Sequence, residues 1–142
     1  AQYQDFRSKL AETHFYRVIT KSEPFSDALL DREWKLVALH ESDEIIRPKT
    51  GRKHTLNLDR KGKVTGWNDC NRYFGSFKLE KGNWLNFGKG FGSTLMLCMP
   101  GSLDFEFFES LKTSKGFEVD GDKLKLYYGD NAEYWMEFRE ND

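Results

Sequence analysis

The sequence predicts a mainly β domain, an antiparallel meander of short strands with one α-helix. The chain of 142 residues carries 12 Phe, 6 Tyr and 4 Trp, and large rings pack well on the pleated surface of a sheet. Short extended segments alternate with Gly-containing turns, which is typical of hairpins. One segment, after residue 100, carries apolar residues at helical spacing.

We expect residues 1–28 to form an N-terminal extension that packs on a β domain of residues 29–142. Apolar residues at helical spacing between positions 3 and 10 indicate a helical arm, and the aromatic, β-branched segment 14–20 favours a strand. The Ser22-Glu23-Pro24 order indicates a capped helical turn, because Pro is well placed early in a helix.

The β domain is predicted to begin with a strand in which Trp34, Leu36 and Ala38 alternate with other residues and line a core. Glycines in the following turns can adopt the left-handed conformation that tight hairpins need. The expected strand pairs are 54–58 with 63–67, 75–79 with 84–87, and 117–119 with 123–128, followed by a last strand at 132–139.

The expected helix has Leu103, Phe107 and Leu111, together with Phe108, on one face. Ser102 precedes this run and is a candidate N-cap, because a hydroxyl oxygen can accept a free backbone N–H. Gly116 is expected to end the helix in a left-handed conformation.

Charge and hydropathy exclude several classes of protein. Charged residues make up 32% of the chain, but the net charge is −1 and basic residues form no block, which argues against nucleic acid as a partner. We expect no transmembrane segment, since no apolar stretch reaches the length a bilayer requires. The first ten residues lack the apolar core of a signal peptide. Because the sequence starts at Ala1 without Met, an anchor or signal on a precursor stays compatible with it.

The segments around the two cysteines carry a family pattern. The first motif is a Trp-x-Leu strand that begins at Trp34. The second is a Gly followed by Cys-Asn and then by an aromatic residue and Gly. The third is Thr-x-Met-x-Cys. The residues of the second and third motifs are Gly66, Cys70, Asn71, Phe74, Gly75, Thr94, Met96 and Cys98. With the strand pair of residues 117–126, this order over residues 29–139 resembles the META-domain family, which includes the heat-inducible HslJ-type envelope proteins of bacteria.

The resemblance implies an antiparallel, partly closed barrel-like sheet of about seven or eight strands with one α-helix packed against it. It also implies a protein of the periplasm or cell envelope, lipid-anchored or secreted, with the cytoplasm less favoured. Since the family carries Cys70 and Cys98 together, it implies a disulfide, while two buried thiols stay the alternative. Two positions depart from the family pattern: Asp69 stands where Gly is usual, and Leu95 where a basic residue is usual.

We find no catalytic grouping in the sequence, and we predict no enzyme activity, metal or cofactor. His14, His40 and His54 have no partner at metal-ligand spacing. Residues 88–94 are rich in Gly but lack the spacing of a phosphate-binding loop.

Three residues are candidate contacts for a ligand or partner, namely Trp67, Arg72 and Trp84. We expect Trp67 and Trp84 on neighbouring strands, where a ring cluster could line a pocket, although such clusters more often form core. Asn71, Gly66 and Gly75 are interpreted as turn formers, with a ligand-facing role for Asn71 as the alternative.

The leading hypothesis is a non-catalytic envelope or secreted protein that binds another protein or a cell-surface component during stress. The first alternative is a small-ligand-binding module that uses the mouth of the barrel. The second is a thiol-based redox protein that works through Cys70 and Cys98.

Overall fold

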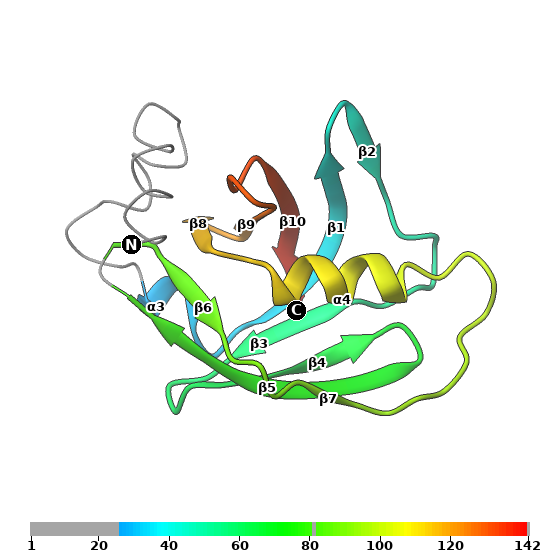
Figure 1. The fold of residues 1–142 in the computed structure, drawn as a ribbon, viewed down its shortest axis with the longest axis horizontal. Helices are drawn as coiled ribbons and strands as arrows, with labels where there is room; N and C mark the ends of the chain where they lie inside the picture. The colour runs from blue at the N-terminus through cyan, green and yellow to red at the C-terminus, as the bar shows by residue number, and fades with distance from the viewer. Residues whose placement is uncertain (1–25, 81, 142) are drawn as a thin grey trace.

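The computed structural model describes residues 26–80 and 82–141, so the predictions for the first 25 residues lie outside the described residues. Two helices and ten strands make up this part of the chain (Figure 1). The helices are α3 (Ser26–Leu29) and α4 (Asp104–Lys112). The strands are β1 (Glu33–Glu41), β2 (Glu44–Ile46), β3 (Thr55–Leu58), β4 (Lys63–Asn68), β5 (Asn71–Leu79), β6 (Leu85–Phe87), β7 (Gly92–Ser93), β8 (Gly116–Asp120), β9 (Lys123–Tyr128) and β10 (Tyr134–Glu140).

The strands form one antiparallel sheet that nearly closes on itself. Its order is β6-β5-β4-β3-β1-β10-β9-β8. The two outer strands approach each other where Trp84 forms a bridge with Gly116 and the Leu85 N–H donates to the Lys115 carbonyl at 2.8 Å. The predicted mainly β, antiparallel, barrel-like fold is therefore confirmed. The extra strands are β2, which pairs with β1, and β7, which pairs with β5, and both are too short to show a period in the sequence.

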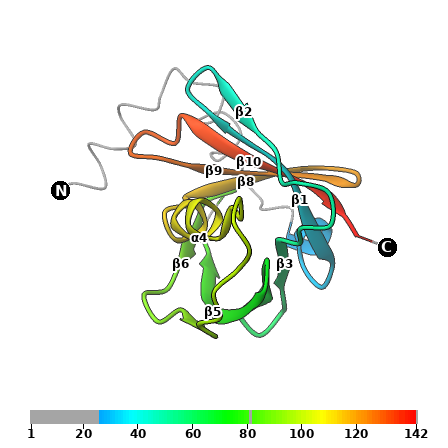
Figure 2. The same cartoon turned by 90° about the vertical axis from the view of Figure 1, so that its right-hand side faces the viewer.

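Helix α4 completes the core at the open side of the sheet. Figure 2 shows it nearly end-on, between β8–β10 and the β5–β6 side. Phe107 and Leu111 are fully buried, as their helical spacing predicts. The Phe107 ring lies 5.2 Å from His54, 6.0 Å from Tyr73 and 6.3 Å from Phe138, measured between ring centroids. Side chains from the sheet and the helix thus fill the interior.

The ends of α4 differ from those predicted. Leu103 occupies the N-cap position, while the Ser102 hydroxyl oxygen accepts the Asp104 N–H at 3.1 Å just before the helix. The helix ends at Lys112, and Gly116 begins β8 instead of stopping the helix. The helix ends before Gly116 because Gly116 pairs with Trp84 in the sheet.

A buried histidine links the sheet to the start of α4. His54 is 1% exposed, and its Nδ1 lies 2.9 Å from Asn68 Oδ1. Asn68 Nδ2 in turn donates to the Asp104 carbonyl at 2.8 Å. Since an amide oxygen only accepts, Nδ1 carries the proton, and Nε2 is left without a partner among the described residues. Burial therefore lowers the pKa of His54.

We expect this histidine to make the domain sensitive to acid. A pKa that is lower in the folded state than the unfolded value near 6.5 means that the unfolded chain takes up the proton first. Folding stability is then lost as the pH falls below about 6.5, by at most about 1.4 kcal/mol per pH unit. His54→Asn keeps an N–H toward Asn68 and should flatten the dependence, measured by urea unfolding between about pH 7.5 and about pH 5.

A second histidine provides the control for this experiment. The pKa of His40 is also lowered by burial, but its side chain is 19% exposed, so its contribution should be smaller. The variant His40→Asn is expected to keep most of the wild-type slope. A His54→Asn protein with the full wild-type slope would show that the network around His54 does not set the acid limit.

Candidate functional site

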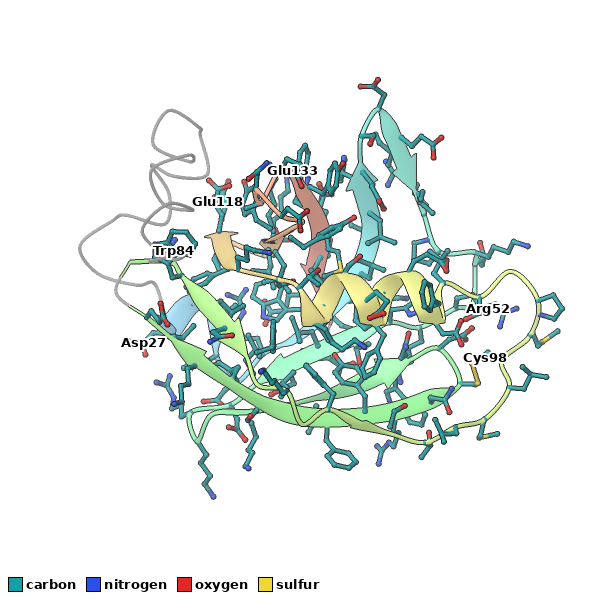
Figure 3. The ribbon with its side chains drawn as sticks, viewed as in Figure 1. Asp27, Arg52, Trp84, Cys98, Glu118 and Glu133 are labelled. Atoms are coloured by element: carbon teal, nitrogen blue, oxygen red, sulfur yellow. A yellow bond between two sulfur atoms is a disulfide. The ribbon has the colours of Figure 1, made fainter. Side chains whose placement is uncertain are left out.

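A disulfide joins the β4–β5 turn to the segment after β7. Cys70 and Cys98 are bonded, with their Cα atoms 5.5 Å apart. Figure 3 shows Cys98 at the end of the molecule where α4 begins, close to Arg52. Arg52 donates to the Pro100 carbonyl at 3.3 Å and pairs with Asp69 at 3.1 Å. The covalent bond thus fixes one end of an irregular segment against the sheet.

The side chain of Asn71 holds the same segment by hydrogen bonds. Its Oδ1 accepts the Met96 N–H at 2.7 Å and the Thr94 hydroxyl at 2.9 Å. Its Nδ2 donates to the Met96 carbonyl at 2.9 Å, so the amide pairs with Met96 as a neighbouring strand would. The Thr94 hydroxyl oxygen also accepts the Arg72 N–H at 3.0 Å. Asn71 begins β5 and is buried, so it is a clamp and not only a turn former.

The turn that carries Cys70 accommodates the first departure from the family pattern. Asp69 has φ +58°, a left-handed conformation in which Gly is at ease and which Asp tolerates better than most residues. Its N–H donates to the Lys53 carbonyl at 2.6 Å, and its carboxylate binds Arg52. These contacts explain how the turn forms with Asp in place of Gly.

The clamped segment and the first turn of α4 present apolar side chains to solvent. Leu95 is 94% exposed and Leu97 is fully exposed, while Met96, Met99 and Phe105 are each more than 60% exposed. We call these five residues the loop surface. A hollow of about 410 Å³ separates the segment from α4. Exposed apolar side chains that gather in one part of a surface are typical of an interaction site.

Gly66 lies inside β4 and not in a turn, because two groups approach it closely. A Cβ at this position would collide with the Thr55 carbonyl and would lie 2.7 Å from the Tyr73 hydroxyl. That hydroxyl donates to the Thr55 carbonyl at 2.5 Å, and burial holds the pKa of Tyr73 well above its usual value. Gly75 likewise lies inside β5, where a Cβ would meet the ring of Phe91. Both glycines serve packing.

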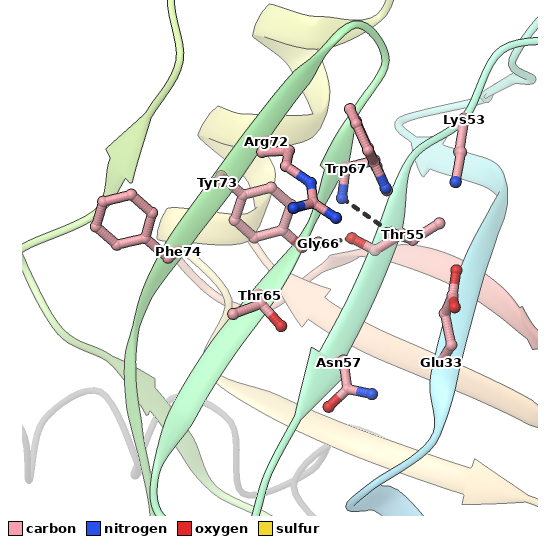
Figure 4. Close-up of a pocket in the computed structure, with 10 residues that line it drawn as sticks. All are labelled: Glu33, Lys53, Thr55, Asn57, Thr65, Gly66, Trp67, Arg72, Tyr73 and Phe74. Atoms are coloured by element: carbon pink, nitrogen blue, oxygen red, sulfur yellow. Dashed lines mark hydrogen bonds between the residues drawn. The ribbon is translucent and has the colours of Figure 1, made fainter.

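A second concave surface lies on the outer face of β1, β3, β4 and β5 (Figure 4). We call it the outer groove. Its volume is about 490 Å³. Its lining residues are Glu33, Lys53, Thr55, Asn57, Thr65, Gly66, Trp67, Arg72, Tyr73 and Phe74.

Two of the three predicted contact residues meet in the outer groove. The Arg72 guanidinium lies 4.7 Å from the centre of the Trp67 ring, and Lys53 Nζ lies 5.0 Å from it. Trp84 lies elsewhere. It is buried beside β6 where the sheet closes, and β5 separates β6 from the strand of Trp67. The expectation that Trp67 and Trp84 lie on neighbouring strands is therefore wrong, because Trp84 serves barrel closure.

Lys53 and the exposed leucines of the loop surface are functional candidates that the sequence pattern did not identify. Lys53 precedes β3, and no periodicity links it to Trp67. The sequence did hold a signal for the loop surface. Leu95 and Leu97 alternate with the motif residues Thr94, Met96 and Cys98, and no predicted helix or strand accounts for them. Within residues 26–80 and 82–141, no group of three or more His, Cys, Asp or Glu side chains is arranged to hold a metal ion. The helices of this part of the chain are all too short or too polar to cross a bilayer.

The family assignment rests on most of the chain. The model of the META domain matches residues 27–141. The chain belongs to the META domain family. The N-terminal boundary at residue 28 stays a prediction.

Two solved structures are similar to this META domain. The NMR structure of a protein from Burkholderia xenovorans is 26% identical, with a TM-score of 0.66, and the match covers 85% of this chain and 92% of that one. The crystal structure of a DUF4847 family protein from Bacteroides vulgatus has a TM-score of 0.59 at 13% identity, and the match covers 82% of this chain and 96% of that one. The second similarity shows the shared fold alone. None of the curated proteins matches the sequence.

Proposed function

We propose that this META domain is a non-catalytic binding domain of the cell envelope or of a secreted protein, and that a partner protein docks on the loop surface. The observation that carries the proposal is the combination of exposed Leu95 and Leu97 with the disulfide and the Asn71 clamp. Burial of apolar surface away from water lowers the free energy. A segment that is already fixed loses little conformational entropy on binding.

The neighbouring helix indicates the chemistry of the partner. Asp104 and Glu109 line the hollow beside the loop surface, and α4 also carries Glu106 in its first turn. Lys112 also lines the hollow and neutralises Glu109 at 2.8 Å, so the rim keeps its acidic character through Asp104 and Glu106. We expect a partner segment with apolar residues flanked by Lys or Arg. The same acidic rim disfavours an anionic lipid surface, since like charges repel.

Two amphipathic peptides with the same apolar residues test this proposal, one flanked by Lys and the other by Glu. In an NMR titration of the full chain, the Lys peptide should shift amides of residues 94–99 and 104–109. The double variant Leu95→Ser/Leu97→Ser should lose that binding without unfolding, because both side chains are exposed. Equal binding of the Glu peptide, or shifts confined to other surfaces, would contradict the proposed docking site.

The compartment is part of the same proposal, as is a role during stress. A disulfide supports an oxidising location such as the periplasm, the envelope or the cell exterior. Maleimide labelling of the protein in freshly fractionated cells should leave both cysteines unlabelled until reductant is added. Recovery of the protein from the cytoplasm with two free thiols would contradict the location.

A further inference from the structure

The lining of the outer groove holds two cations and one carboxylate, so the groove carries a net positive charge. Figure 4 shows the ring of Trp67 between the side chains of Arg72 and Lys53. In the part of the chain that the structure describes, neither cation has a carboxylate within 4.0 Å. The carboxylate of the lining, Glu33, accepts a hydrogen bond from Asn141 at 3.0 Å. Packing on an indole restricts both cations, so their charges stay at the groove.

A row of residues in register carries the positive charge from the groove toward β10, where Arg139 is paired with Asp122 at 3.8 Å. Lys35 pairs with Thr55 on β3, and on its other side it pairs with Arg139 on β10. Trp67 pairs with Arg72, and the backbone N–H of Trp67 donates to the Thr55 hydroxyl oxygen at 2.9 Å. Side chains of residues in register share one face of a sheet. Among the described residues Lys35 and Arg72 have no ion pair, and with strands about 4.8 Å apart they lie roughly 14 Å from each other.

A charged row of this length fits an extended ligand better than a single small anion. The overall net charge is −1, so the cations of the row are segregated and do not reflect a basic protein. Arg72 offers a planar guanidinium, which binds carboxylates through two parallel hydrogen bonds. Duplex nucleic acid is less suitable, since its affinity depends on contacts to many closely spaced phosphates.

The next row of the groove supplies groups that bind sugars. Asn57 pairs with Thr65, and Thr65 pairs with Phe74. The amide and hydroxyl can exchange hydrogen bonds with sugar hydroxyls, and the Phe74 ring, 60% exposed, offers an apolar face for a sugar ring. The volume of about 490 Å³ is that of a typical ligand site.

We propose that the outer groove binds an acidic polysaccharide, a linear sugar chain with carboxylates, laid across β5, β4, β3 and β1. Lys53, Arg72 and Lys35 bind the carboxylates, and Phe74 and Thr65 contact the sugar rings. This site is separate from the loop surface, so the two proposals can succeed or fail independently.

Oligogalacturonate, a chain of carboxylated sugars, is the probe for this site. Calorimetry on the full chain should detect its binding, which should weaken as salt is added. The double variant Lys53→Gln/Arg72→Gln should bind about tenfold more weakly. The matched control Lys61→Gln/Lys89→Gln removes the same charge outside the groove lining and should change the affinity by less than about twofold. If the double variant misfolds by circular dichroism, Lys53→Gln alone replaces it.

Further ligands distinguish the contribution of the sugar rings to binding from that of the carboxylates. Poly-glutamate carries carboxylates without rings and should bind more weakly than oligogalacturonate, and Phe74→Ala should weaken only oligogalacturonate. Equal affinity for poly-glutamate, tighter binding of single-stranded DNA, or equal binding of a neutral galactan would overturn the proposal. So would the absence of oligogalacturonate binding at low salt.

Discussion

Replacing Cys70 and Cys98 by serine should lower the free energy of unfolding by about 3–4 kcal/mol. The bond closes a long loop, because its cysteines are 28 residues apart, and in the chain-entropy model a crosslink of this span restricts the unfolded state by that amount. Urea unfolding of the wild type and the double variant measures the difference. We expect the amide of Met96 to keep part of its protection from hydrogen exchange, since Asn71 still accepts its N–H.

Reductant provides the control for the disulfide experiment. It should destabilise the wild type by a similar amount and leave the double serine variant unchanged. Equal stability of the oxidised wild type and the double serine variant would show that the bond does not restrain the unfolded chain. If mild reductant opens the bond while the fold stays intact, the thiol-based redox hypothesis for Cys70 and Cys98 becomes the better explanation.

The main strands could be predicted because their signals are local. Trp34, Leu36 and Ala38 repeat at the period of a strand, and each is buried in β1. The strand β7 could not be predicted, because Gly92 and Ser93 are too few to show a period. It forms where Gly92 leaves room for the ring of Phe74 on β5.

Most of the candidate site could not be predicted because it depends on long-range pairing. Asn71 resembles a turn former locally, and its role becomes visible only when Met96, 25 residues away, reaches its amide. Gly66 is required by the Tyr73 hydroxyl and the Thr55 carbonyl, which arrive from neighbouring strands. The family pattern includes these positions but does not reveal the contacts that require them.

Phe107→Ala should cost about 3–5 kcal/mol, which makes it the most damaging single substitution that we consider. Phe107 is fully buried, and its ring contacts rings from three strands or their edges, those of His54, Tyr73 and Phe138. Truncation leaves a cavity between helix and sheet that rigid strands cannot fill. The loss should also weaken the Asn68 bond to the start of α4. Urea unfolding at neutral pH measures the cost.

The matched control lies two residues earlier on the same helix. Phe105 is 69% exposed, so Phe105→Ala makes the same chemical change without opening a cavity, and it should alter the unfolding free energy by less than about 0.5 kcal/mol. Because helix propensity favours Ala equally at both positions, the difference between the variants isolates the packing of Phe107. Equal losses of unfolding free energy in the two variants would mean that α4 contacts the sheet without contributing to its core. The loop surface would then be fixed by the disulfide and Asn71 alone.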